Sequence, residues 1–196
     1  MGDRGQAFTL EAFLASLLLV TSLVFAIHAT AVTPLSSSTS NRHVEDQLTP
    51  LAAGILDASV ANGSLKPTVL YWNDTRGTFH GTSVGGYYVT GGPPTPFGGL
   101  LDRTFYDDGV VFDVNVEYLT QDGKSRTVPL VKQGSPSDHA ARAYRTLTLF
   151  DDDVLYRADG TPTNVTLSAS STFFAPDVDP GDVYNVVRVE VVVWRA

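Results

Sequence analysis

The sequence predicts an α+β fold in which an N-terminal transmembrane helix precedes a mostly antiparallel β domain with one or two packed helices. Two observations lead to this prediction. A run of 21 residues from Ala12 to Val32 contains no Asp, Glu, Lys or Arg, and stretches of alternating apolar and polar residues fill much of the second half of the chain. We therefore divide the 196 residues into a short cytoplasmic leader (1–11), a transmembrane helix (12–33) and an extracellular α+β domain (34–196).

The composition excludes several classes of function. The chain has no Cys, which removes disulfides, thiolate nucleophiles, zinc–thiolate sites and iron–sulfur ligation. Its formal net charge of −8 offers no basic face, so no nucleic-acid partner is expected. The charged residues are 17 Asp, 4 Glu, 10 Arg and 3 Lys. Such an Asp-rich, Lys-poor surface resembles that of halophilic, haloarchaeal proteins, with an acidic extracellular mesophile protein as the alternative.

The apolar run is long enough to span a bilayer. At a rise of 1.5 Å per residue, 21 residues cover about 30 Å, the thickness of a hydrocarbon core. Hydroxyl groups within the run can bond back to the helix backbone, and Pro34 with the polar stretch 36–41 ends it. Few helices of globular proteins stay apolar on all sides for this length.

The residues in front of the run carry a recognisable pattern. Asp3–Glu11 reads DRGQAFTLE, with one Arg and with an acidic residue at the start of the apolar stretch. It resembles the class III signal peptide of archaeal type IV pilin-like, membrane-anchored proteins, whose core reads FTLIE, and the resemblance covers about 30 residues. It implies cleavage by a prepilin peptidase-type enzyme, with the helix kept in the mature subunit. It also implies that Glu11 pairs with the α-amino group of a neighbouring subunit.

The cleavage site stays open between two bonds. A cut after Gly5 makes Glu11 the sixth mature residue, whereas a cut after Gln6 makes it the fifth, which is its usual place in that family. A competing interpretation uses Ala29–Ala31 as a signal-peptidase site and releases residues 32–196 as a secreted protein. Because the leader holds one Arg and the apolar stretch exceeds an ordinary h-region, we favour the retained anchor.

The body is predicted to contain two helices and several hairpins. Residues 43–61 have helical spacing, with Thr49 and Pro50 as a new start or kink and Asn62-Gly63 as the stop. A second helix is predicted over 137–150, capped by Ser137 or Asp138. The predicted strands are 68–72 with 78–80, 110–120 with 125–131, a strand at 164–174 returning from a turn at 158–160, and a central strand at 183–194. A long surface loop is predicted over 81–99, which holds seven Gly and three Pro.

No catalytic, cofactor-binding or metal-binding residue is predicted. Gly81–Gly85 fits the G-x-S-x-G pattern around Ser83, and His139 with Asp102, Asp107 or Asp113 would complete a triad. The pattern lacks the strand before and the helix after that this chemistry requires. The acidic groups 151–153 and 177–182 are interpreted as solvated turns, because neither completes a calcium loop. The four His residues are isolated from one another in the sequence.

The predicted function is that of a non-catalytic, membrane-anchored, pilin-like or pseudopilin-like surface subunit. Asn62, Asn73 and Asn164 begin N-x-[ST] sequons and are candidate N-glycosylation sites. They favour a single-pass protein of the cell membrane with its C-terminal domain outside. The expected partners are membrane lipid, like subunits or other pilin-like proteins, and the processing peptidase. The alternative is a monomeric anchored or secreted binding module of the cell envelope that uses the loop at 81–99.

Overall fold

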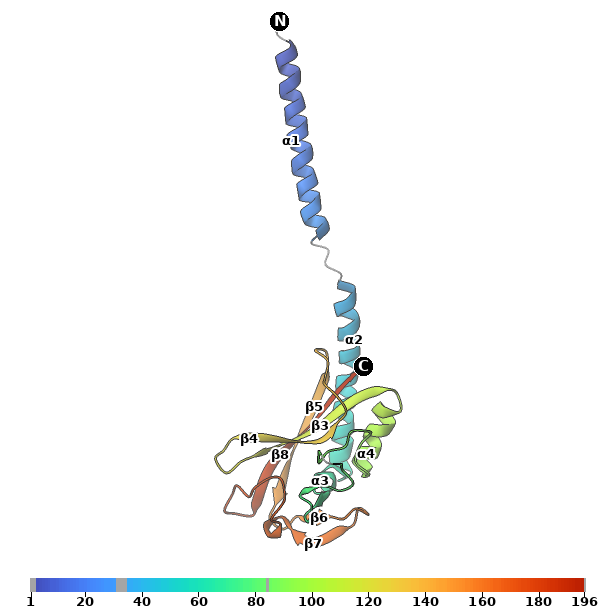
Figure 1. Cartoon of the computed structure of the whole chain (residues 1–196), viewed down its shortest axis with the longest axis vertical. Coiled ribbons are helices and arrows are strands. Elements are labelled where there is room, and N and C mark those ends of the chain that lie inside the picture. The colour runs from blue at the N-terminus through green and yellow to red at the C-terminus, as the bar shows by residue number, and fades with distance from the viewer. Residues whose placement is uncertain (1–2, 31–34, 84, 196) are drawn as a thin grey trace. The chain divides into compact units, whose positions relative to one another are not determined.

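The computed structural model describes residues 3–30, 35–83 and 85–195 (Figure 1). In the first helix, side chains are described at Thr9 and from Glu11 to Ala26, and in the second helix from Gln47 onward. The chain divides into two compact units, Met1–Asn41 and Arg42–Ala196.

Helix α1, Asp3–Thr30, begins the first unit. Its internal hydroxyls bond to its own backbone, as expected from the sequence. Ser16 Oγ donates to the Phe13 carbonyl at 2.8 Å, and Thr21 Oγ1 donates to the Leu17 carbonyl at 2.9 Å. These bonds satisfy the hydroxyl donors of Ser16 and Thr21 within the helix itself.

The prediction of a transmembrane helix over 12–33 is wrong. Over the residues that the structure describes, no helix combines the length and the apolar character that a membrane span requires. The prediction counted uncharged residues through Val32, whereas α1 ends at Thr30 and residues 31–34 lie outside the described residues. The uninterrupted stretch of described side chains, 11–26, corresponds to about 24 Å of helix, against about 30 Å for a hydrocarbon core.

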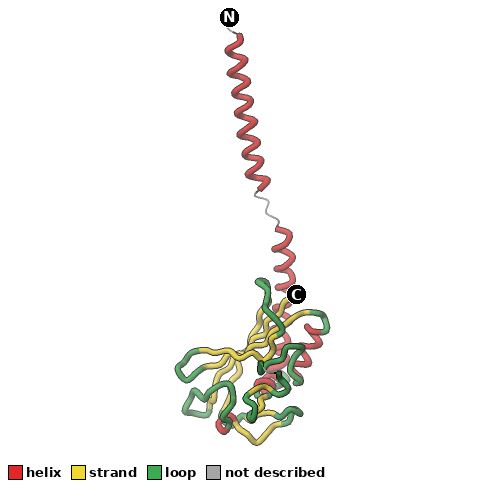
Figure 2. The backbone as a smooth tube through the Cα atoms, viewed as in Figure 1, coloured by secondary structure: helices red, strands yellow, loops and turns green. Residues whose placement is uncertain are grey.

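The remainder of the fold class is confirmed, because the body is α+β with antiparallel sheets (Figure 2). The main sheet has the order β4-β3-β8-β5. Both the predicted hairpin at 110–131 and the predicted central strand are present. The four strands are β3 (Val110–Leu119), β4 (Ser125–Lys132), β5 (Ala141–Phe150) and β8 (Val183–Arg195).

Strand β5 replaces the helix that was predicted over 137–150. It pairs antiparallel with β8 along its whole length. Its burial alternates, with Ala141, Ala143 and Leu149 buried while Arg142 and Tyr144 are exposed. A period of two residues suits a strand that is covered on one face, and this pattern outweighs a cap residue at the start of the segment.

Helix α2, Leu35–Ala61, contributes to the same core as the sheet. It continues through Pro50, so the predicted new start at Thr49 is wrong. A proline inside a helix costs about 3 kcal/mol, which the burial of Leu48 and Leu56 on either side offsets. The predicted stop is confirmed. Gly63 has a φ of +71°, and Ser64 N–H donates to the Ser59 carbonyl at 2.9 Å.

The remaining elements are short. The hairpin predicted near residue 75 forms, but residues 68 and 69 belong to a helix rather than a strand. The strand predicted over 164–174 ends at Thr166, because Phe173 and Phe174 pack edge-on against Trp72. These elements are α3 (Leu65–Val69), β1 (Trp72–Asn73), β2 (Thr78–Phe79), β6 (Val154–Tyr156), β7 (Pro162–Thr166) and the 3₁₀ helix Leu167–Ala169.

The segment predicted as a surface loop, 81–99, is part of the packed body. Tyr88 N–H donates to the Leu130 carbonyl at 2.9 Å and its carbonyl accepts from Lys132 N–H at 2.8 Å, so it extends the sheet beside β4. Phe97, in helix α4 (Pro96–Leu101), is fully buried. A π-helical turn, Asp102–Tyr106, follows directly. Glycine content indicated irregular backbone but not the burial that its apolar residues bring.

Candidate functional site

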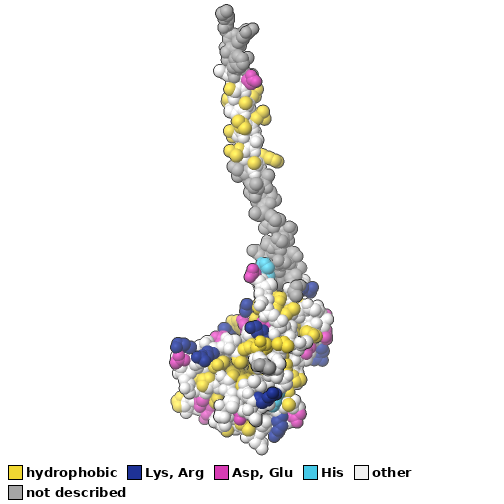
Figure 3. Space-filling view, viewed as in Figure 1, with side chains coloured by type: hydrophobic (Ala, Val, Ile, Leu, Met, Phe, Trp, Pro, Cys, Tyr) yellow, Lys and Arg dark blue, Asp and Glu magenta, His cyan; other side chains and the backbone are white. Residues whose placement is uncertain are grey.

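The described part of α1 is apolar on every side. The consecutive residues Leu17, Leu18, Leu19 and Val20 are 51%, 70%, 71% and 58% exposed. Because successive residues of a helix are about 100° apart, these four side chains point in all directions around the axis. Figure 3 shows apolar side chains along the face of α1 turned to the viewer. Further exposed apolar side chains of the helix are Phe13, Leu14, Leu23, Val24 and Phe25.

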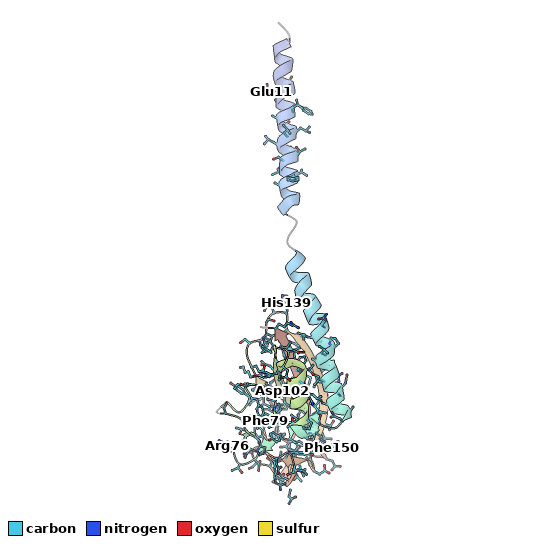
Figure 4. The ribbon with its side chains drawn as sticks, turned by 90° about the vertical axis from the view of Figure 1, so that its right-hand side faces the viewer. Glu11, Arg76, Phe79, Asp102, His139 and Phe150 are labelled. Carbon is cyan, nitrogen blue, oxygen red and sulfur yellow. The ribbon has the colours of Figure 1, made fainter. Side chains whose placement is uncertain are left out.

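Glu11 is the sole charged residue of the sequence between Arg4 and Arg42. It lies on α1 just before the apolar stretch and is exposed (Figure 4). Within the described residues it makes no hydrogen bond or ion pair. A carboxylate in this position would be costly to bury unless a cation accompanied it. The geometry thus places one exposed carboxylate at the start of a helix whose described side chains are exposed and largely apolar.

The proposed processing positions, Gly5 and Gln6, lie near the start of α1, and their side chains are outside the described set. Processing after either residue stays a prediction. So does the pairing of Glu11 with a neighbour's amino group.

The three sequons have different surroundings. Asn62 Oδ1 accepts from Ser64 N–H at 2.9 Å, within the turn that ends α2. Asn73 Oδ1 accepts from two backbone N–H groups at 3.1 Å in the β1–β2 turn. Asn164 is exposed on β7, and its side chain has no hydrogen-bond partner in the part of the chain that is described. All three sites stay predictions, and Asn164 differs from the other two in that its side chain makes no hydrogen bond within the described residues.

The G-x-S-x-G pattern does not form a nucleophile elbow. The Ser83 carbonyl accepts from Gly86 N–H at 3.0 Å in a turn, and no helix starts there. Asp102 instead accepts from Gly92 N–H at 2.6 Å. His139 lies in the exposed turn before β5 (Figure 4). Among the residues described, no hydrogen bond links Ser83, His139 and an aspartate.

The structure brings together two acidic turns, 151–153 and 177–182, that are 24 residues or more apart in the sequence. Asp151 N–H donates to the Asp182 carbonyl at 3.1 Å. Burial, followed by repulsion from Asp177 and Asp182, raises the pKa of Asp151. One Asp151 oxygen is buried without a hydrogen-bond partner. Even so, no group of three or more His, Asp or Glu side chains in the described ranges is arranged to hold a metal ion.

A hollow of about 540 Å³ lies beside α3, between α2 and the β5–β6 turn. Its one ammonium group is already engaged. Lys66 Nζ lies 2.5 Å from Asp153 Oδ2 and 4.8 Å from the centre of the Phe150 ring. Sequence analysis did not find this hollow, because its lining residues come from four separate segments: 59–63, 65–70, Leu147 and 152–156.

The fold defines an α+β protein that carries an exposed apolar helix ahead of a packed antiparallel body. This chain belongs to a family of unknown function, DUF7288, which matches residues 4–193 and thus includes both α1 and the last strand. Comparisons with curated proteins and with solved structures gave no match.

Proposed function

We propose that this protein is a non-catalytic, pilin-like subunit that associates with like subunits through helix α1. The observation that carries the proposal is the exposure of large apolar side chains on all sides of that helix. Burying one such side chain is worth about 1.5–3 kcal/mol. A bundle of α1 helices from several chains would bury most of them, so association is strongly favoured over a solvated helix.

Glu11 gives the bundle its register. A single charged group in an apolar helix bundle lowers the stability of the bundle but fixes the axial offset between neighbouring helices. Only one offset brings the charge next to a group of opposite charge. The resemblance of residues 3–11 to a class III signal peptide supports a partner for it, the α-amino group freed by cleavage after Gly5 or Gln6. The exposed position of Glu11 at the start of the apolar stretch is compatible with such an end-to-side contact.

The alternative function, a monomeric binding module, draws support from the hollow beside α3. Its volume of about 540 Å³ falls in the range of small-molecule sites. The loop at 81–99 gives this alternative less support than the sequence suggested, because its centre is bonded to β4.

The variant Glu11→Val separates the two functions. Under the proposal it leaves the neighbour's amino group buried and unpaired, so the dissociation constant of the assembly should rise by at least about tenfold. The measurement is sedimentation of the processed full-length chain, with electron microscopy of the product. Asp138→Asn, in an exposed turn of the body, is the matched control and should assemble like the natural chain. A monomeric natural chain, or equal assembly of both variants, would contradict the proposal.

The mature N-terminus provides a second, independent test. Processing by a prepilin peptidase-type enzyme leaves Gln6 or Ala7 as the first residue and keeps α1 in the subunit. Mass spectrometry of the protein from its own cells reads this directly. A chain that began at Val32 would lack the whole association surface and would sink the proposal.

A further inference from the structure

We propose that the free edge of strand β5 binds the same edge of a second copy of this chain, as an antiparallel pair centred on Thr146. The contact lies on the body and does not depend on helix α1. It would join two main sheets into one continuous sheet.

The register of the main sheet shows which backbone groups of β5 point outward. Backbone N–H and C=O groups of successive residues alternate between the two neighbouring strands. Thr120 N–H donates to the Lys124 carbonyl across the β3–β4 hairpin, so even-numbered residues of β3 bond to β4 and odd-numbered ones to β8. Because Glu117 is opposite Arg188, Arg188 bonds to β3, and its neighbour Val187 bonds to β5 on the other side. Val187 is opposite Leu147, so Leu147 bonds to β8. Odd-numbered residues of β5 therefore bond to β8, and even-numbered residues face away from the sheet.

One hydrogen bond supports this assignment independently. The carbonyl of Tyr144 accepts from its neighbour's guanidinium, Arg145 Nη1, at 2.7 Å. This carbonyl therefore lies outside the ladder with β8. The outward N–H and C=O groups of Arg142, Thr146 and Thr148 have no partner among the described residues.

The two edges of the sheet are treated differently by the fold. At the β4 edge, Tyr88 bonds to both Leu130 and Lys132, and Pro129 has no N–H to offer. A bulge further interrupts the β3–β4 pairing between Val114 and Asn115. These are the devices by which proteins prevent a sheet edge from pairing with another chain. The β5 edge has ten residues, and it is closed in this way only at its last residue. There the pairing with β8 shifts register between Leu149 and Phe150, and both backbone groups of Phe150 bond to Asp153.

The side chains of β5 complement a second β5. Centring the antiparallel pair on Thr146 places Arg142 opposite the partner's Phe150, and Tyr144 opposite the partner's Thr148. Tyr144 is 57% exposed and Phe150 is 40% exposed, so both rings are accessible. Arginine over an aromatic ring, and an aromatic beside a β-branched residue, are favourable cross-strand pairs. A register shifted so that Arg145 faces Arg145 would oppose like charges and is disfavoured.

Charge also permits the contact, although the whole chain carries −8. The arginines near this edge are each paired with an acid on the same sheet or on α2. These pairs are Arg142 with Glu190 at 3.4 Å, Arg145 with Asp57 at 2.6 Å, and Arg188 with Glu117. The meeting faces are therefore locally neutral, and two acidic bodies can approach there.

Cysteine cross-linking tests the register directly, because the natural chain has no Cys. In the full-length chain, Thr146→Cys puts two thiols at the centre of the pair. Directly opposed residues have Cα atoms about 5.5 Å apart, within the span of a disulfide. Diamide should convert this variant to a covalent dimer at least tenfold faster than Thr127→Cys, the control, an exposed threonine on β4. Tyr144→Cys and Thr148→Cys should cross-link with each other when mixed, and neither with itself.

A second variant removes the hydrogen bond and leaves the sheet's own ladder intact. Thr146→Pro deletes an outward N–H that β8 does not use. Thr146→Pro is added both to the Tyr144→Cys chain and to the Thr148→Cys chain before the two are mixed. The rate of cross-linking between them should then fall at least tenfold, while the melting temperature measured by circular dichroism should change little. Thr127→Pro, outward on β4, should have no effect. Three results would each overturn the proposal. The first is equal cross-linking rates for Thr146→Cys and Thr127→Cys. The others are a Tyr144→Cys chain that cross-links with itself, and a Tyr144→Cys to Thr148→Cys cross-link that Thr146→Pro does not slow.

Discussion

Helix α1 and strand β8 both carry long apolar runs, but their side chains are in opposite environments. Val187, Val189, Val191 and Val193 of β8 are fully buried between neighbouring strands and the rest of the core. On α1, Leu18 and its neighbours are largely exposed. The difference teaches that apolar content predicts an element that will be covered without saying what covers it. For β8 the cover is the chain's own body, whereas for α1 we infer other chains.

The largest expected effect comes from placing a charge in each run. Val189→Asp buries an unpaired carboxylate in the central strand, so it should lower the free energy of unfolding of the body by about 4 kcal/mol or more. Leu18→Asp should leave that free energy unchanged while weakening association. Urea unfolding followed by tryptophan fluorescence measures the first quantity, and sedimentation the second. If both variants destabilised the body equally, α1 and β8 would share one core and the comparison would fail.

A pair of phenylalanines gives a smaller, sharper version of the same test. Phe97 is 0% exposed and Phe13 is 66% exposed. Phe97→Ala should lower the free energy of unfolding by about 3–5 kcal/mol, because it removes a large buried ring from the core. Phe13→Ala should change it by less than about 0.5 kcal/mol. If Phe97→Ala changed the free energy of unfolding as little as Phe13→Ala, residues 81–99 would again be interpreted as a solvent-exposed loop. Thermal melts followed by circular dichroism are the measurement.

The parts of the fold that were predictable are those whose pattern is local. The alternation in 110–120 and in 183–194 predicted two strands of the sheet, and Asn62-Gly63 predicted the end of α2, because each signal lies within its own element. Strand β5 was missed because its apolar positions are small or widely spaced. Its own sequence leaves the choice between helix and strand ambiguous, and the pairing with β8 decides for the strand.

The candidate site was predictable only in part, for a related reason. The apolar character of α1 and the isolation of Glu11 are readable from residue order alone. The packing of 81–99 is not, because the bonds from Tyr88 to β4 join positions 40 or more residues apart. The free edge of β5 and the meeting of the two acidic turns likewise depend on long-range pairing. Such features require the register between strands, which a single sequence does not contain.

The smallest effect should come from the body's own charges, and it tests whether repulsion among its aspartates limits the stability of the body. The pKa of Asp151 is raised by burial and by the repulsion of the surrounding aspartates. A carboxyl with a raised pKa binds its proton more tightly in the folded state than in the unfolded state. Its contribution to stability is therefore present at acidic pH and is lost as pH rises through its folded pKa.

Asp151→Asn should accordingly melt at a higher temperature than the natural chain at pH 7. The advantage should shrink as the pH falls and the natural carboxyl takes up its proton, and also in molar salt, which screens the neighbouring aspartates. Asp159→Asn is the control of opposite sign. Hydrogen bonds from Thr161 lower the pKa of Asp159, so its stabilising charge is present at pH 7 and lost on acidification. Thermal melts over pH and salt decide the matter. If Asp151→Asn raised the melting temperature by the same amount at every pH and salt concentration, repulsion among the aspartates would not limit the stability of the body.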